Sequence, residues 1–404
     1  MSRRNLDRQR SSGGCLIVVF SGILTILVAL LLLLTLVPVF SPSTGANMAD
    51  MLRSVVGPGP VALLESVSYK FQDVFNQVRY QVSGDQSQIA FSDHSQDPIA
   101  PTPAPPTPAP GNDQNAPGTP VVPAKVFNVV LDGPPVGWQA YGPYVDGFPA
   151  MAHALEMLDA QRSYTAIALV RIDLSRLQLH MMPGIVEPAH PSGIAKAIPD
   201  LGMVPPADQS HLVAAFNGGF KQVHGYYGMM TDGVTLLPPK PGIATVALYQ
   251  DGRVQIGAWG TDIVQTPDLV AFRQNCPPLV EAGQVNPDLY QDNRAAWGTT
   301  GNSDITWRTG LGITQDGRYL IYAVGNGTSA ATLAEGLKEA GAYMAMQLDI
   351  NQYYAHFYTY QAEGAPNASA AIQMTGNRLV AEMVNNPHLY LTPYPRDFFY
   401  LTTH

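Results

Sequence analysis

The chain has 404 residues, of which 46% are hydrophobic and 13% are charged, so it can bury a large core without a metal ion or disulfide bonds to stabilise it. Its 22 basic and 31 acidic residues give a net charge of −9, which argues against a nucleic acid as partner. Only two cysteines are present, Cys15 and Cys276, and this number excludes a disulfide-rich scaffold.

A long apolar segment follows a basic N-terminal tail. Residues 15–40 contain no charged residue and are long enough to cross the roughly 30 Å hydrocarbon core of a bilayer as a helix. The tail, residues 1–14, carries several arginines, and the positive-inside rule places it in the cytoplasm. We predict that residues 15–40 are an uncleaved signal anchor in the membrane, because the apolar region of a cleaved signal peptide is only about 7 to 15 residues long. Cleavage near residues 44–46 is the alternative.

Two segments without a globular pattern come next. Apolar residues of 60–81 recur at intervals of three and four, which predicts an amphipathic helix; they are Leu64, Val67, Phe71, Val74 and Val78. We interpret residues 41–83 as a stalk whose helix lies on the membrane or on a neighbouring surface. Residues 84–124 are rich in proline and are typical of an extended linker that holds the remainder of the chain away from the bilayer.

Residues 125–404 have the composition of one globular domain. Strand-like runs, β-branched or alternating, occur at 165–174, 211–220, 245–259, 310–324 and 343–350. Helices are predicted between them, and the combination indicates a domain of the α/β (α+β) class with a mixed β-sheet.

The helices and turns of this domain have recognisable boundaries. One helix is predicted at about 148–160 and a second at 329–342, where Ser329 can cap the first turn and Gly341 can end the helix. The sequence Gln-Asp-Gly-Arg occurs at 250–253 and again at 315–318, each time between strand-like arms. Asp-Gly is a strong turn signal, so each occurrence predicts a β-hairpin.

Three strand ends carry residues that suit binding or catalysis. One strand opens into Asn217, Gly218 and Gly219, where glycine lets the main chain approach a ligand closely, although an ordinary tight turn has the same sequence. Arg308 precedes a strand, and its guanidinium can bind a phosphate through two parallel hydrogen bonds or form a structural salt bridge. Asp349 ends a strand at the kind of position where sheets hold ligands, or serves as a cap.

Taken in chain order, these segments resemble the phosphodiester glycosidase family. The resemblance covers roughly residues 160 to 395 and rests on AFNGGF (215–220), NCPPLVEAG (275–283), WRTGLGITQDGRYLIYAV (307–324), SAATLAEGLKEAGA (329–342) and YMAMQLDI (343–350). It implies hydrolysis of a sugar-1-phosphodiester in a pocket that holds the catalytic residues Asn217, Arg308 and Asp349. In that pocket Arg308 binds the phosphate, and the Asp349 carboxylate near the sugar activates water or stabilises the oxocarbenium-like ring.

Substrate-binding residues are expected around this pocket: Gly218, Gly219, His224, Thr309 and Asn351. His224 is a candidate acid or hydrogen-bonding ligand, or else a surface histidine. After Asp349 the family continues with glycines and a serine, whereas this chain has Ile350, which disfavours the positive φ angles and the close approach that glycine permits. Asn351 can supply one left-handed position. The aromatic residues of 353–357 form a sugar-stacking platform or pack as core.

A lid and a metal were considered for the same pocket. Residues 284–306 are long and polar enough for a lid, or for a surface loop. Acidic residues such as Asp232, Asp292 and Asp304 lack the spacing of an EF-hand or a zinc site, so no metal and no cofactor are expected.

These observations predict a membrane-anchored hydrolase whose main domain lies outside the cytoplasm, in a bacterial cell envelope. Its substrate would be a sugar-1-phosphodiester of an envelope glycan, an exopolysaccharide or a glycolipid. The alternatives are a catalytically inactive module that binds glycans or phosphoglycans, and an envelope scaffold protein.

Overall fold

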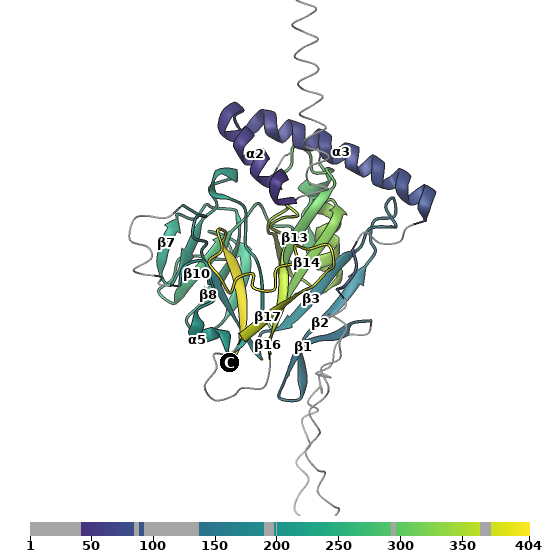
Figure 1. The fold of residues 1–404 in the computed structure, drawn as a ribbon. Helices are drawn as coiled ribbons and strands as arrows, with labels where there is room; N and C mark the ends of the chain where they lie inside the picture. The colour runs from purple at the N-terminus through teal and green to yellow at the C-terminus, as the bar shows by residue number, and fades with distance from the viewer. Residues whose placement is uncertain are drawn as a thin grey trace, which may run out of the picture.

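Three antiparallel β-sheets form the body of the protein (Figure 1). The computed structural model describes residues 42–84, 89–92, 137–189, 198, 200–291, 296–363 and 373–404. Every pair of neighbouring named strands is antiparallel, and helices are few, so the domain belongs to the α+β class.

The largest sheet contains, in spatial order, β1 (Gln139–Val145), β2 (Phe148–Glu156), β3 (Ile167–Asp173), β14 (Tyr319–Thr328), β13 (Thr306–Ile313), β15 (Met344–Gln347), β11 (Val280–Glu281) and β12 (Gln284–Val285). A second sheet contains β7 (Val234–Leu237), β6 (Met229–Thr231), β10 (Leu269–Gln274), β8 (Ala244–Tyr249) and β9 (Val254–Ala258). The third contains β17 (Gln373–Arg378), β16 (Phe357–Glu363), β5 (Leu212–Asn217), β18 (Phe398–Thr403) and β4 (Leu177–Met182). The helical elements are α2 (Pro42–Val56), α3 (Pro58–Ser83), α5 (Pro206–Gln209), α6 (Ala330–Glu339) and the 3-10 turns η2 (Gln222–His224) and η3 (Pro287–Tyr290).

Both predicted hairpins are confirmed. β8 pairs with β9, and β13 pairs with β14. Gly252 and Gly317 sit in the turns with φ angles of 84° and 73°, the left-handed region that glycine enters without strain. The predicted helix at 329–342 is α6, in which the Ser329 hydroxyl accepts a hydrogen bond from the Thr332 N–H at 3.0 Å, as expected for an N-cap.

The helix predicted at 148–160 is wrong, because residues 148–156 form strand β2. All residues from 150 to 154 are buried, and the strand pairs with β1 on one side and β3 on the other. A short run of small apolar residues fits a fully buried strand as well as a buried helix, and here the two neighbouring strands decide the outcome.

The core is divided by the eight-stranded sheet. On one face the third sheet packs against it, and Phe216, Tyr322 and Phe357 meet there with ring centroids 5.0–5.8 Å apart. On the other face α6 buries Leu333 and Leu337. Each fully buried apolar side chain of this kind contributes about 1.5–3 kcal/mol. Rigid packing on both faces fixes the positions of the strand ends that form the candidate site.

Helices α2 and α3 lie together on one side of the body, opposite the C-terminus (Figure 1). α3 confirms the amphipathic helix predicted at 60–81. It is tied to the body by Arg162, whose guanidinium donates to the Asp73 carboxylate at 2.7 Å, and by Ser66, whose hydroxyl donates to Asp304 at 3.0 Å.

Much of the region upstream of residue 137 lies outside the described residues, including the anchor predicted at 15–40. Among the helices that the structure describes, none is both long enough and apolar enough to cross a bilayer. Within the predicted linker at 84–124, residues 89–92 pack onto the domain: Ile89 is fully buried, and the Ser92 N–H donates to the Leu379 carbonyl at 3.0 Å. This part of the linker therefore belongs to the folded body.

Candidate functional site

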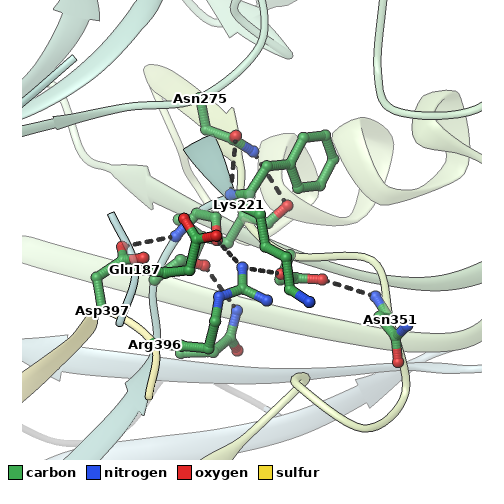
Figure 2. A network of polar contacts seen from close by, with 12 residues as sticks. Glu187, Lys221, Asn275, Asn351, Arg396 and Asp397 are labelled. Carbon is green, nitrogen blue, oxygen red and sulfur yellow. Dashed lines mark hydrogen bonds and ion pairs between the residues drawn. The ribbon is translucent and has the colours of Figure 1, made fainter. Parts of the chain in front are cut away.

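An ion pair between Asp349 and Arg396 lies where three strand ends meet. Figure 2 shows Arg396 in its network of polar contacts, with Asp397 on one side of it and Asn351 on the other. Nη2 of Arg396 donates to Oδ2 of Asp349 at 2.7 Å and to the Gly219 carbonyl at 2.8 Å. Oδ1 of Asp349 accepts the Asn351 N–H at 2.9 Å. Asp349 follows β15, Gly219 follows β5 and Arg396 precedes β18, which lies beside β5 in the third sheet. The fold therefore brings together groups that are far apart in the sequence.

Arg396 is held in its charged form. Burial works against the charge, but Asp349 and Asp397 lie beside the guanidinium and raise the pKa of Arg396 above its ordinary value. The guanidinium also lies 4.4 Å from the centre of the Tyr354 ring, a cation–π contact that adds to the stabilisation. Its Nε has no hydrogen-bond partner among the described residues, so this buried cation keeps donor capacity.

A pocket of about 180 Å³ opens over this ion pair. From the domain it is lined by Asp349, Arg396, Lys221, His224 and Tyr354, together with Phe220, Gly298, Ile350 and Asn351. The other wall comes from α2 and α3, which contribute Ala46, Asp50, Arg53, Pro58, Ala62, Glu65 and Tyr69. The two helices interpreted as a stalk are thus part of the site.

The pocket holds three cations and three carboxylates. The Lys221 ammonium contacts the Asp50 carboxylate, and Arg53 contacts both Asp50 and Glu65. Burial raises the pKa of the Glu65 carboxyl above its ordinary value, although Arg53 beside it acts in the opposite direction. Arg396 adds the third cation. Each of these cations is paired with a carboxylate, and their N–H groups are the charged donors that the pocket can offer to an anionic ligand.

His224 lines the pocket in a neutral form. Burial, with Arg53 nearby, lowers the pKa of His224 to about 4. Its Nε2 is buried and has no hydrogen-bond partner among the described residues. At neutral pH the ring therefore presents an uncharged nitrogen that can bond a hydroxyl group of a ligand.

Asn217 and Thr309 lie beneath the pocket and hold the main chain of Asp349. Nδ2 of Asn217 donates to the Thr309 hydroxyl at 3.0 Å, and that hydroxyl donates to the Asp349 carbonyl at 2.6 Å. Oδ1 of Asn217 accepts the Tyr322 hydroxyl and the His356 N–H. The structure places Asn217 and Thr309 next to Asp349, but neither is among the residues that line the pocket, and both act on the main chain of Asp349.

Gly218 and Gly219 allow a buried ion pair, Arg273 with Asp397, to lie close to the main chain. Arg273 and Asp397 are each 1% exposed, with Nε and Oδ2 2.8 Å apart. A Cβ atom on Gly218 would lie 2.0 Å from Oδ2 of Asp397, and one on Gly219 would lie 3.0 Å from Cζ of Arg273. The Gly219 N–H donates to the same Asp397 oxygen. These glycines let the end of β5 fold tightly around that pair.

Arg308 is fully buried and uses all five N–H groups within the protein. They donate to the main-chain carbonyls of Trp297, Asp304 and Thr328 and to the side chains of Thr299 and Gln347. Burial lowers the pKa of Arg308 to about 10, so the group remains charged at neutral pH. No N–H is left to bind a phosphate.

The same bonds attach the segment proposed as a lid. Residues 292–295 lie outside the described residues, but Trp297 is buried and donates from Nε1 to the Pro277 carbonyl at 3.0 Å. Only Gly298 of the described part of 284–306 reaches the pocket lining. This part of the segment is a fixed wall.

The loop after Asp349 does not need glycine. Neither Ile350 nor Asn351 is among the described residues with positive φ. Ile350 is 9% exposed and packs beside Gly298 and Phe220, and Tyr354 is 8% exposed beneath Arg396. Ile350 therefore fills space next to Asp349 by ordinary packing.

Sequence reasoning missed Arg396, Lys221 and Glu65. Arg396 lies two residues before a strand, close to the signal that drew attention to Arg308, and Lys221 directly follows the AFNGGF segment. Glu65 had no such signal, because the helix that carries it was interpreted as a stalk. Among the described residues, no group of three His, Cys, Asp or Glu side chains is placed to hold a metal ion.

Residues 210–349 match the phosphodiester glycosidase family, as the sequence motifs indicated. The matched stretch starts just before β5 and ends at Asp349. No curated protein matches the chain.

Similar solved structures have low identity. The zebrafish N-acetylglucosamine-1-phosphodiester alpha-N-acetylglucosaminidase catalytic domain, auto-inhibited by its pro-peptide, is 15% identical with a TM-score of 0.40 over 66% of this chain and 87% of that one. A hypothetical protein from Synechocystis is 9% identical (TM-score 0.39; 65% and 64%), and a protein of Burkholderia pseudomallei described as exported is 12% identical (TM-score 0.33; 59% and 74%).

Proposed function

We propose that this protein is an extracytoplasmic glycosidase that hydrolyses the bond between a sugar and its 1-phosphodiester. The family match over residues 210–349 supports a glycosidase-type activity. The observation that carries the proposal is the Asp349–Arg396 pair, which sets a carboxylate and a cation side by side in a pocket with Lys221 and Arg53.

In the proposed reaction, the oxygen of a water molecule bonds to C1 of the sugar while the bond from C1 to the phosphate oxygen breaks. The bonding electrons leave with the phosphate monoester, which needs no strong acid because the leaving group is already a stable anion. Arg396 and Lys221 stabilise the departing charge. Asp349 stabilises the positive charge on the ring and takes up the proton of the water.

We assign the phosphate contact to Arg396, in place of Arg308. Arg396 lines the pocket and has an unpartnered buried Nε, whereas every N–H of Arg308 is already bonded. Arg308 then acts on the pocket only through the wall at Gly298 that it holds.

We further propose that the domain is tethered to the outer side of a cytoplasmic membrane by residues 15–40. The absence of charged residues from this segment and the arginines that precede it support the tether. Its substrate would then be an envelope glycan, an exopolysaccharide or a glycolipid.

One observation favours a second function, a phosphoglycan-binding module without activity. A β-branched residue, Ile350, follows Asp349 directly in the chain and lines the same pocket. A small displacement of a sugar from the catalytic carboxylate lowers the rate steeply while binding persists.

The test uses the full chain in detergent, because α2 and α3 form one wall of the pocket. It is incubated with methyl phosphodiesters of the 1-phosphates of glucose, galactose, mannose and N-acetylglucosamine, and free sugar is measured. We expect release from at least one donor, a loss of roughly 10³-fold in Asp349→Asn and of roughly 10²-fold or more in Arg396→Met. Arg253→Met, an exposed arginine outside the pocket, is the matched control and should retain full activity.

Calorimetric titration with the same donors separates the two functions. Binding that Arg396→Met removes, with no sugar released by the unsubstituted protein, would establish the binding module. Neither binding nor release across the panel would reject both.

A further inference from the structure

Helix α3 carries an apolar stripe on its outer face. The stripe residues are each 43–83% exposed and follow one another at intervals of three, four or one along the helix, so they share one side of it. They are Leu63, Val67, Phe71, Val74, Phe75, Val78 and Val82. The end of α2 adds exposed Met51, Val55 and Val56. An apolar surface of this extent marks a contact with something outside the domain.

The orientation of α3 is the reverse of a helix that packs on a core. Its polar face is turned to the body, where Asp73 binds Arg162, Ser66 binds Asp304 and the Tyr80 ring packs against Tyr164. These contacts hold the helix without using the stripe. The exposed stripe is therefore separate from the contacts that attach α3 to its own domain, which also include the fully buried Val61.

Charge and position favour a lipid bilayer as the occupant. Among the exposed residues of α3 the charged ones are Lys70 and Arg79, and no acidic residue is exposed there. Apolar side chains flanked by basic ones are typical of helices that lie in the interface of an anionic membrane. The charge-free segment that ends at Phe40 stops just before α2 begins at Pro42, so α2 starts within a few residues of its end.

We propose that α2 and α3 lie on the bilayer surface, with the stripe among the lipids and the polar face of α3 on the domain. The helices then form a platform between the lipid and the body, as their arrangement on one side of the molecule in Figure 1 allows. A second copy of the chain, or the chain's own residues 15–40, are the competing occupants of the stripe.

The experiment measures the depth of single positions in the full chain. Cys15→Ser is the background, and Cys276 is fully buried. Phe71→Cys and Val78→Cys report on the stripe, and Val264→Cys, with a similar exposed fraction of 52%, is the matched control on the body. Each variant is labelled with an environment-sensitive fluorophore and placed at one copy per lipid nanodisc that contains anionic phospholipid.

We expect blue-shifted emission at positions 71 and 78 that is quenched by brominated lipid and little affected by aqueous iodide, whereas a label at position 264 shows the opposite. Equal iodide quenching at all three positions would overturn the proposal. Shielding of positions 71 and 78 from both quenchers would also overturn it, because it would show that protein covers the stripe. No outcome depends on catalysis, so the result is independent of the proposed function.

Discussion

Two buried arginines show how similar residues take different roles in this protein. Arg308 and Arg396 are 0% and 5% exposed; Arg308 lies within β13 and does not precede a strand as predicted, whereas Arg396 lies two residues before β18. Every N–H group of Arg308 donates to a carbonyl or a side chain of the protein. The guanidinium of Arg396 donates to Asp349 and also lines a pocket. The number of donors left over, and not burial or charge, separates a structural arginine from a binding one.

Replacement of Arg308 by Met should therefore unfold the protein more easily. The change leaves several buried oxygens without a donor, each at a cost of about 1–3 kcal/mol, so we expect the free energy of unfolding to fall by at least about 3 kcal/mol. Urea denaturation measures it, with Arg253→Met as a surface control that changes stability by less than about 0.5 kcal/mol. Unchanged stability with lost turnover would instead place Arg308 in contact with substrate.

The neutral state of His224 gives a dependence of stability on pH. Its pKa is about 4 in the folded protein against the ordinary 6.5, so below pH 6.5 the unfolded chain takes up a proton that the folded protein does not. Relative to His224→Asn, the unsubstituted protein should lose stability as the pH falls from 6.5 towards 4. Denaturant unfolding of both proteins at several pH values measures this difference, and a constant difference would contradict the low pKa.

The candidate site was only partly accessible to sequence reasoning. Asp349 and Asn217 carried local signals, a strand end and an Asn-Gly-Gly turn, and both lie at the site. The side chains of adjacent strand residues point to opposite faces of the sheet, so only one of Arg308 and Thr309 can point towards Asp349. The sequence did not show which, and in the structure it is the Thr309 hydroxyl that bonds to Asp349. Arg396 follows Asp349 by 47 residues and joins it only because β18 inserts between β5 and β4.

At the level of elements, turns, caps and the strand-like runs of β3, β5 and β15 were predictable, whereas the apolar run at 148–156 was not. The two Asp-Gly hairpins and the Ser329 cap are local interactions, visible in a few residues. The run at 148–156 is apolar and has no clear helical or strand periodicity. It forms strand β2 because β1 and β3 pair with it on its two sides. α3 was predicted from its stripe, but the stripe alone did not show that the polar face would bind the domain and complete a pocket.

α2 places a carboxylate where the substrate phosphate is expected. Asp50 contacts the Lys221 ammonium in the pocket, so Asp50 and the phosphate compete for the same cation. In Asp50→Asn we expect KM for a sugar-1-phosphodiester to fall roughly threefold to tenfold with kcat nearly unchanged, since a partly exposed pair is worth about 1 kcal/mol. Steady-state kinetics measure this, with the exposed Asp251→Asn as control. A higher KM would mean that Asp50 helps to hold the substrate.

For the molecule as a whole, the pocket and the proposed lipid surface share two helices. α2 and α3 line the pocket, while the outer face of α3 carries the apolar stripe. If the stripe lies on a bilayer, the pocket opens within one helix thickness, about 10–12 Å, of the lipid headgroups. A substrate attached to lipid would reach it at a high effective concentration.

We compare two substrates of the full chain in vesicles: a sugar-1-phosphodiester with a lipid aglycone and the methyl ester of the same sugar phosphate. We expect kcat/KM to be at least roughly 10²-fold higher for the lipid substrate, because attachment to the same membrane raises its effective concentration at the pocket. Sugar release from mixed vesicles measures the ratio. Dissolving the vesicles in excess detergent is the control and should bring the two rates together. Equal rates for the two substrates in intact vesicles would show that the pocket is not held close to the membrane surface.

Strand β18 has a bearing on how the protein matures. It lies in the interior of the third sheet, flanked by β5 and β4, yet it comes from residues 398–403, and Arg396 lies two residues before it. Synthesis runs from the N-terminal to the C-terminal side, so every other part of the pocket is made first. Until that last strand emerges, β4 and β5 each have an open edge and Asp349 lacks its counter-ion. A chain that stops before residue 396 would therefore lack the Asp349–Arg396 pair and leave the edges of β4 and β5 unpaired, so it should be prone to aggregation.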